Sequence, residues 1–118
     1  MTGEKAPVAG PFVDVWVNCP DRAVAERIAD ACVAKRLAAC ANIFSPVSSL
    51  YRWKGAVERA EEVPLLLKTR AALFDALCAV IKPLHPHETP SIVATAIVHA
   101  DKTYCDWLDQ ETRDPAPR

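Results

Sequence analysis

Two imidazoles and a carboxylate occur within four residues of the chain, in the segment His85-Pro86-His87-Glu88. Donors of these types suit Cu(II), Zn(II) or Ni(II). Prolines at positions 83, 86 and 90 restrict this loop and so lower the entropic cost of gathering ligands. Because side chains alternate along an extended segment, we expect His85 and His87 to point to opposite sides, one into a cleft and one to solvent. The loop is a candidate for a two-histidine chelate, for a site with one histidine, or for a structural role in which His85 hydrogen-bonds the loop.

A second cluster of polar and aromatic side chains consists of Trp53, Glu58, Glu62 and Lys68. The two glutamates are an even number of residues apart, so they share one face of a strand that has no bulge. Paired carboxylates could bind a cation or act as acid and base. The alternative is a solvated strand face whose charges discourage pairing at the sheet edge. Trp53, next to a predicted turn, is expected to anchor an interface.

The cysteines bear on both chemistry and compartment. There are five, an odd number, and no two have the C-x-x-C spacing of a zinc knuckle or redox motif. Reduced thiols in a cytoplasmic protein are the simplest interpretation. Cys32 and Cys78 lie in helical patterns beside apolar residues and are expected to fill the core. Nothing in the spacing selects one cysteine as a nucleophile.

Length and composition exclude several functional classes. The chain has 118 residues, of which 51% are hydrophobic, so it is expected to build one core without a metal or a disulfide. A formal charge of -1 gives no bulk attraction to nucleic acid or to an anionic membrane. Three scattered glycines cannot form a phosphate loop, and no serine lies in a G-x-S-x-G elbow. The sequence therefore favours a protein that is not an enzyme.

Hydrophobic periodicity predicts an α+β chain. Alternation predicts strands, and apolar residues at helical spacing predict helices, with Asp21 and Asp101 as N-caps. Lys54-Gly55 is expected to form a hairpin turn, and Pro83 to end the second helix. The expected strands are 12–18, 39–53, 57–69 and 91–98, the last of them central and buried, and the expected helices are 21–36, 71–82 and a short one from 101.

The predicted order is β-α-β-β-α-β followed by a short C-terminal helix, which is the ferredoxin-like sandwich. One such domain is expected over 12–112, with flexible tails at 1–11 and 113–118. Pro46 and Pro64 predict bends or bulges in an overlong hairpin. Large apolar residues on both faces of the first strand, such as Trp16 and Val15, predict that the second face of the sheet packs on another subunit.

Five blocks of residues occur in the order seen in the CutA family of divalent cation tolerance proteins, which this sequence resembles from Val13 to Leu108. The blocks are Leu37-Ala38-Ala39-Cys40-Ala41-Asn42-Ile43, Ser49-Leu50-Tyr51-Arg52-Trp53-Lys54-Gly55, Glu58 with Glu62-Val63, Leu67-Lys68-Thr69, and His85-Pro86-His87-Glu88-Thr89-Pro90. The resemblance implies a ferredoxin-like subunit in a tight homotrimer whose long hairpins complete sheets across subunits. It also implies a role in tolerance of copper and other divalent cations.

Residue by residue, the resemblance matches His85 and Glu88 to the family pattern H-P-Y-E-x-P, and the hairpin cluster to family positions. His87 replaces the usual tyrosine and adds a ligand. A cysteine of the first strand that the family associates with copper aligns with Val17, and Cys19 two residues on could substitute for it. Leu84 stands where some members have a second histidine.

The main hypothesis is a cytoplasmic, non-catalytic homotrimer that binds divalent metal, copper above all, through His85, His87 and Cys19. The alternative is a signalling or scaffold protein similar to the trimeric PII proteins. It would take a small ligand or partner at a subunit-interface cleft whose binding residues are Trp53, Glu58, Glu62 and Lys68, with His85 beside them. An enzyme that uses Glu62 and His85 as acid and base is the weakest hypothesis, because no substrate follows from the sequence.

Overall fold

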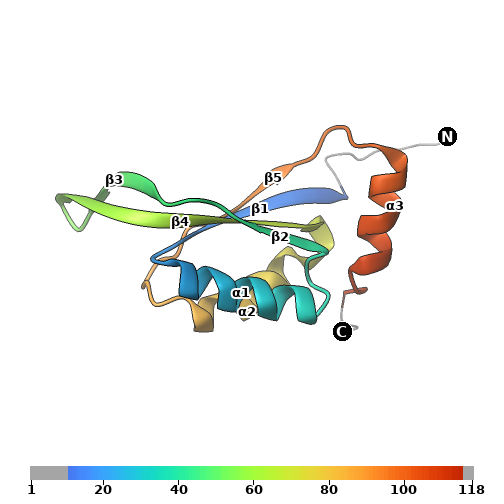
Figure 1. Ribbon diagram of the computed structural model, residues 1–118, viewed down its shortest axis with the longest axis horizontal. Coiled ribbons are helices and arrows are strands. Elements are labelled where there is room, and N and C mark those ends of the chain that lie inside the picture. Colours follow the sequence, from blue (N-terminus) through green and yellow to red (C-terminus); the bar gives the residue numbers. More distant parts are fainter. Residues whose placement is uncertain (1–10, 116–118) are drawn as a thin grey trace.

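The computed structural model describes residues 11–115, in which one antiparallel sheet lies over two helices, and a third helix stands at its end (Figure 1). The predicted tails at 1–11 and 113–118 lie largely outside the described residues. The elements in chain order are β1 (Phe12–Cys19), α1 (Arg22–Ala34), β2 (Cys40–Ile43), β3 (Val47–Trp53), β4 (Ala56–Arg70), the 3-10 turn η2 (Ala71–Leu73), α2 (Phe74–Leu84), β5 (Ile92–Ala96) and α3 (Lys102–Glu111).

The core lies between the sheet and helices α1 and α2. The alternation of β1 places Val13, Val15, Val17 and Cys19 on the buried face, where they pack beside the odd-numbered residues 63–69 of β4. Asp21 caps α1, because its side chain accepts a hydrogen bond from the backbone N–H of Val24 at 2.9 Å. The sheet order β2-β4-β1-β5 agrees with the ferredoxin-like prediction.

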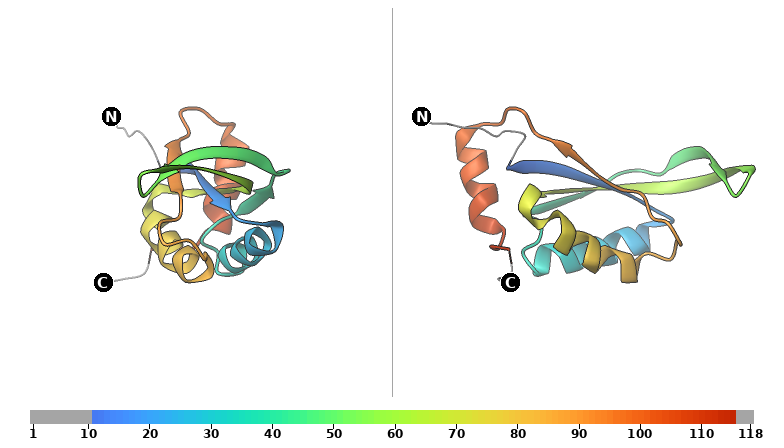
Figure 2. Two further views of the ribbon diagram at one scale, coloured as in Figure 1. Left: turned by 90° about the vertical axis from the view of Figure 1, so that its left-hand side faces the viewer. Right: turned by 180° about the vertical axis from the view of Figure 1, so that it is seen from behind.

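The hairpin formed by β3 and β4 extends past the helices and gives the molecule its long axis of 52 Å (Figure 2). Lys54 and Gly55 at its turn have φ of 49° and 84°, the left-handed pair that suits a two-residue hairpin turn. At the base of the hairpin, residues 44–46 lie opposite only Val63 and Pro64, which is a β-bulge. The bulge predicted at Pro46 is therefore confirmed.

Two predictions about the secondary structure are wrong. Helix α2 continues through Pro83 to Leu84, since proline removes only one hydrogen bond there, and the N–H of His85 closes the last turn on the carbonyls of Ile81 and Lys82. Strand β5 is an edge strand and not a central one, because among residues 11–115 it pairs with β1 alone. Its apolar side chains are accordingly exposed, Val93 by 51%.

The far face of the sheet carries apolar side chains, and no helix of the described part of the chain covers it (Figure 1). Trp16 packs against Phe44 with ring centroids 5.5 Å apart. Leu66 of β4 and Val93 of β5 lie opposite Trp16 on its two sides. The alternation of β1 thus buries one face under α1 and α2 and leaves an apolar face on the other side, as the sequence predicts.

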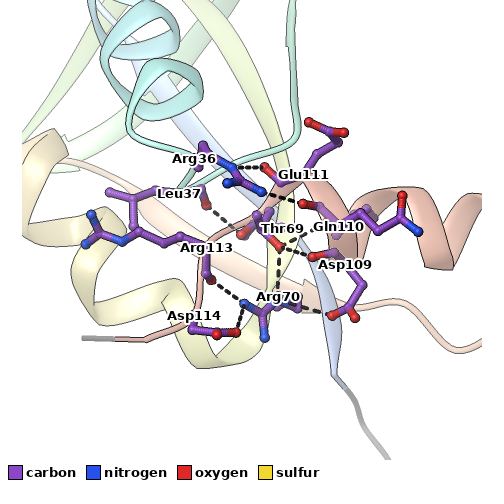
Figure 3. Close-up of polar contacts among 11 residues, drawn as sticks. Arg36, Leu37, Thr69, Arg70, Asp109, Gln110, Glu111, Arg113 and Asp114 are labelled. Carbon is purple, nitrogen blue, oxygen red and sulfur yellow. Dashed lines mark hydrogen bonds and ion pairs between the residues drawn. The ribbon is translucent and has the colours of Figure 1, made fainter. Parts of the chain in front are cut away.

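Two arginines hold α3 and the residues after it, Arg36 from the connection between α1 and β2 and Arg70 from the end of β4 (Figure 3). Arg36 donates to the last carbonyls of α3, those of Gln110 and Glu111. Arg70, whose side chain is 15% exposed, donates to the Thr112 hydroxyl at 2.9 Å and to the Arg113 carbonyl, and lies 3.6 Å from Asp109. Residues 113–114, at the start of the predicted tail, are held by this cluster.

Candidate functional site

A groove of about 700 Å³ lies between the hairpin and the loop that follows α2. The hairpin contributes Ser49, Tyr51, Trp53 and Glu62, which alternate along β3 and β4 and so share one face. The loop contributes His87 and Glu88. Asn18, near the end of β1, also lines the groove. Segments that are far apart in the sequence therefore meet here.

His85 holds the loop to the end of β1. It is buried, its Nε2 lies 2.8 Å from the carbonyl oxygen of Asn18, and its Nδ1 lies 3.2 Å from the backbone nitrogen of His87. The backbone N–H of His87 can only donate, so Nδ1 accepts and the ring proton resides on Nε2, which donates to Asn18. Both ring nitrogens are occupied, and neither offers a lone pair to a metal in this conformation. The contacts correspond to the structural interpretation of His85.

The side chain of His87 is exposed whereas that of His85 is buried, but the two rings lie on the same side of the loop. Its ring lies 4.8 Å from that of His85 at an interplanar angle of 58°, so the prediction that the two rings point to opposite sides is wrong. The reason is that the backbone bends at 87–89 and is not extended there. The His87 ring is exposed in the groove, and within residues 11–115 no protein hydrogen bond engages its nitrogens.

Cys19 lies in the core. Its side chain is fully buried on the helix-facing side of β1. Burial, with smaller contributions from the negative charges of Asp21 and Glu62, raises the pKa of this thiol to about 11. Since the thiolate is the form that binds metals, a neutral buried thiol is a poor ligand. Across the described residues, no three His, Cys, Asp or Glu side chains are gathered to hold one ion. His85, His87 and Cys19 therefore do not form the three-ligand set that the sequence suggests.

The hairpin cluster divides between the groove and the rest of the sheet. Trp53 and Glu62 line the groove. Glu58 shares the face of Glu62, since the β3–β4 register is regular from 56 to 62, but it is exposed nearer the turn. Lys68 is six residues beyond Glu62, about 20 Å along the strand, where it pairs with Asp14 and Cys40. The predicted binding set is thus too long for one pocket.

Sequence reasoning did not assign Tyr51, Ser49 and Asn18 to a site. Alternation from Trp53 could have found Tyr51 and Ser49, because all three occupy the same face of β3. No local signal could have found Asn18, which reaches the groove only because β1 ends beside the loop after α2.

Comparison with known proteins gives the relationship. The family described as CutA1 divalent ion tolerance protein matches residues 13–111. This chain belongs to that family. The resemblance in the sequence is thereby confirmed. The predicted α+β fold is confirmed by the elements described above and by similar solved structures.

Individual relatives support the same family assignment. The chain is 43% identical over 98 residues to the divalent-cation tolerance protein CutA of Thermus thermophilus, covering 83% of this chain and 95% of that one. Protein CutA of mouse is 37% identical over 105 residues, which are 89% of this chain but only 59% of the mouse protein. A solved structure from Archaeoglobus fulgidus, titled periplasmic divalent cation tolerance protein CutA, superposes with a TM-score of 0.82 at 36% identity, over 85% of this chain and 97% of that one.

Among residues 11–115, no helix is long and apolar enough to cross a membrane. The family is named for tolerance of divalent ions and not for a reaction.

Proposed function

We propose that this protein serves divalent cation tolerance as a non-catalytic homotrimer that binds divalent metal ions, with copper preferred. The observation that carries the metal role is the groove, in which one exposed imidazole, that of His87, lies on the same wall as Glu88 and across from Glu62. An imidazole and carboxylates suit divalent transition metals.

Copper is the preferred ion for a reason that does not depend on geometry. Sites built from nitrogen and oxygen donors bind Cu(II) more tightly than the other divalent ions of the first transition row. Because residues 11–115 of one chain gather no three such side chains, we propose exchangeable binding by His87 and a carboxylate, completed by water or a neighbouring subunit. His85 would position the His87 backbone through its Nδ1 and not bind the ion.

Calorimetric titration with Cu(II) tests this proposal. His87→Ala is expected to weaken binding at least tenfold, while His99→Ala, which removes another exposed histidine, serves as the matched control and should bind like the wild type. His85→Ala should weaken binding less than His87→Ala does. Equal affinities for the wild type and His87→Ala would remove the groove from the metal role.

The homotrimer is supported by two features of the sheet. Its far face exposes apolar side chains around Trp16 and Val93, and within the described chain the outer edge of β5 pairs with nothing. Such an edge and such a face are normally covered in a stable protein. A projecting hairpin that meets the next copy's edge generates a head-to-tail contact, which closes into a ring when the rotation allows it. Light scattering after gel filtration would give the mass directly.

We also propose a cytoplasmic location and no catalytic activity. All five cysteines are free, which fits a reducing compartment. The weaker hypothesis of an enzyme with His85 as acid or base loses support, because both nitrogens of His85 are engaged by the protein. Cell fractionation would test the location.

A specific observation favours a second candidate function, that of a PII-like sensor or scaffold. The groove is larger than a hydrated ion needs and has aromatic walls, Tyr51 and Trp53, so it is of the size and character of small-molecule sites. A thermal-shift screen of metals and metabolites separates the two functions, because a ligand of the native state raises the melting temperature.

A further inference from the structure

Two carboxylates line the groove, and a third lies on the same face of the hairpin. Glu62 and Glu88 line it, and Glu58 lies on the same hairpin face nearer the turn. The two hairpin arginines, Arg52 and Arg59, belong to the alternate positions of β3 and β4 and so lie on the other face. The groove and its hairpin face therefore favour a cation over an anion.

One ammonium group of the protein already lies at the rim. The Nζ atom of Lys54 is 5.5 Å from the centroid of the Trp53 ring and 3.5 Å from Oε1 of Glu88. The first distance is within the range of a cation–π interaction. The side chains of Lys54 and Glu88 are 70% and 71% exposed, so their ion pair is weak and readily exchanged.

We propose that the groove binds an organic ammonium cation, whose charged nitrogen takes the place of Lys54 between the Trp53 ring and Glu88. Tyr51 supplies further apolar wall for the ligand's carbon atoms, and Glu62, which is less exposed than Glu88, supplies a second carboxylate. A volume of about 700 Å³ accommodates a small amine with several carbon atoms. This inference rests on the second candidate function, that the groove is a ligand site.

Proton NMR titration with tetramethylammonium chloride tests the inference, with EDTA present so that no divalent metal takes part. The methyl resonance is expected to shift upfield and to saturate, since a methyl group over an aromatic face experiences the ring current. tert-Butanol, a neutral molecule of nearly the same shape, should show at most a small shift, because it lacks the charge that the ring and the carboxylates attract.

Substitutions then separate the contacts. Trp53→Leu is expected to lower the affinity about fivefold or more, as loss of a cation–π contact would. Glu62→Gln and Glu88→Gln should each lower it severalfold. Lys54→Gln should raise it about threefold, because the competing ammonium is removed. Lys35→Gln, at the far end of α1, makes the same charge change and should leave the affinity unaltered.

The inference is overturned if tetramethylammonium gives no saturable shift, if tert-butanol shifts equally, or if Glu62→Gln and Trp53→Leu bind like the wild type. It is also overturned if Lys54→Gln binds more weakly. The metal proposal does not depend on these results, because it is decided by copper titration of His87→Ala without an amine present.

Discussion

Alkaline pH should destabilise this protein through Cys19, and the size of the effect follows from its burial. The side chain of Cys19 is fully buried, and its pKa is raised from the ordinary value of 9.0 to about 11. A raised pKa means that the unfolded chain loses the proton first. The stability that the neutral thiol contributes is therefore complete below pH 9 and is lost as the pH rises from 9 through 11.

The magnitude can be worked out for one pH step. With 1.36 kcal/mol for each pKa unit, a thiol that titrates at 9.0 unfolded and at about 11 folded lowers the free energy of unfolding by about 1.3 kcal/mol between pH 8 and pH 10. Burial raises the pKa of Cys32 to about 12, so this second core thiol adds a similar loss over the same step.

Urea unfolding at pH 8 and pH 10, at one fixed protein concentration, measures this effect. Cys19→Ala removes the titrating group, so its loss of stability between the two pH values should be smaller than that of the wild type by about 1.3 kcal/mol. Taking the difference between pH values cancels the cavity that the substitution leaves. Val17→Ala, on the same buried face of β1, creates a cavity without removing an ionisable group and should lose as much as the wild type.

If Cys19→Ala loses as much stability as the wild type over this step, the thiol is not held neutral by burial. Cys19 would then be a candidate metal ligand again, because a metal ion can displace the proton of a thiol whose pKa is ordinary. A loss that is smaller by about 1.3 kcal/mol in the variant instead confirms that burial keeps the Cys19 thiol neutral well above its ordinary pKa.

Three further predictions concern the attachment of α3, the hairpin turn and the oligomer interface. Arg70→Ala should lower the free energy of unfolding by about 2 kcal/mol and speed amide exchange in α3, because it removes charge-assisted hydrogen bonds to Thr112 and Arg113. The control Arg22→Ala removes an exposed ion pair within α1 and should lower the free energy of unfolding by less than about 0.5 kcal/mol. Equal losses in the two variants would contradict the role of Arg70. Gly55→Ala should lower the free energy of unfolding, measured by thermal unfolding, by about 1 kcal/mol. A φ of 84° is unfavourable for any residue with a Cβ, although no atom outside Gly55 and its two chain neighbours lies within 4 Å of that Cβ. An unchanged stability would mean that the turn relaxes. Val93→Glu, on the far face of the sheet, should reduce the mass measured by light scattering. The control Val33→Glu, at an exposed valine of α1, should leave the mass unchanged. An unchanged mass for Val93→Glu would exclude the far face of the sheet from the oligomer interface.

Local sequence determined most of the fold because its signals act over a few residues. Alternation along Phe12–Cys19 gives a strand, Asp21 accepts from the N–H three residues on, and Lys54-Gly55 has the left-handed pair that a tight hairpin needs. The extra residue at Pro46 likewise follows from a proline that cannot donate to the sheet. The family, too, could be identified from its motifs.

The site was decided by contacts between segments that are distant in the sequence. The histidine loop could be recognised as chemically capable, but only the packing of α2 against the sheet places the His85 ring 2.8 Å from the carbonyl of Asn18, 67 residues away, and so removes it as a ligand. The edge position of β5 likewise depends on which strand it meets, and not on its own apolar composition. Sequence therefore determined which residues could do chemistry and on which elements they lie. Tertiary structure decided which of them share a groove, because burial and hydrogen bonding set whether a lone pair is free or a thiol can ionise.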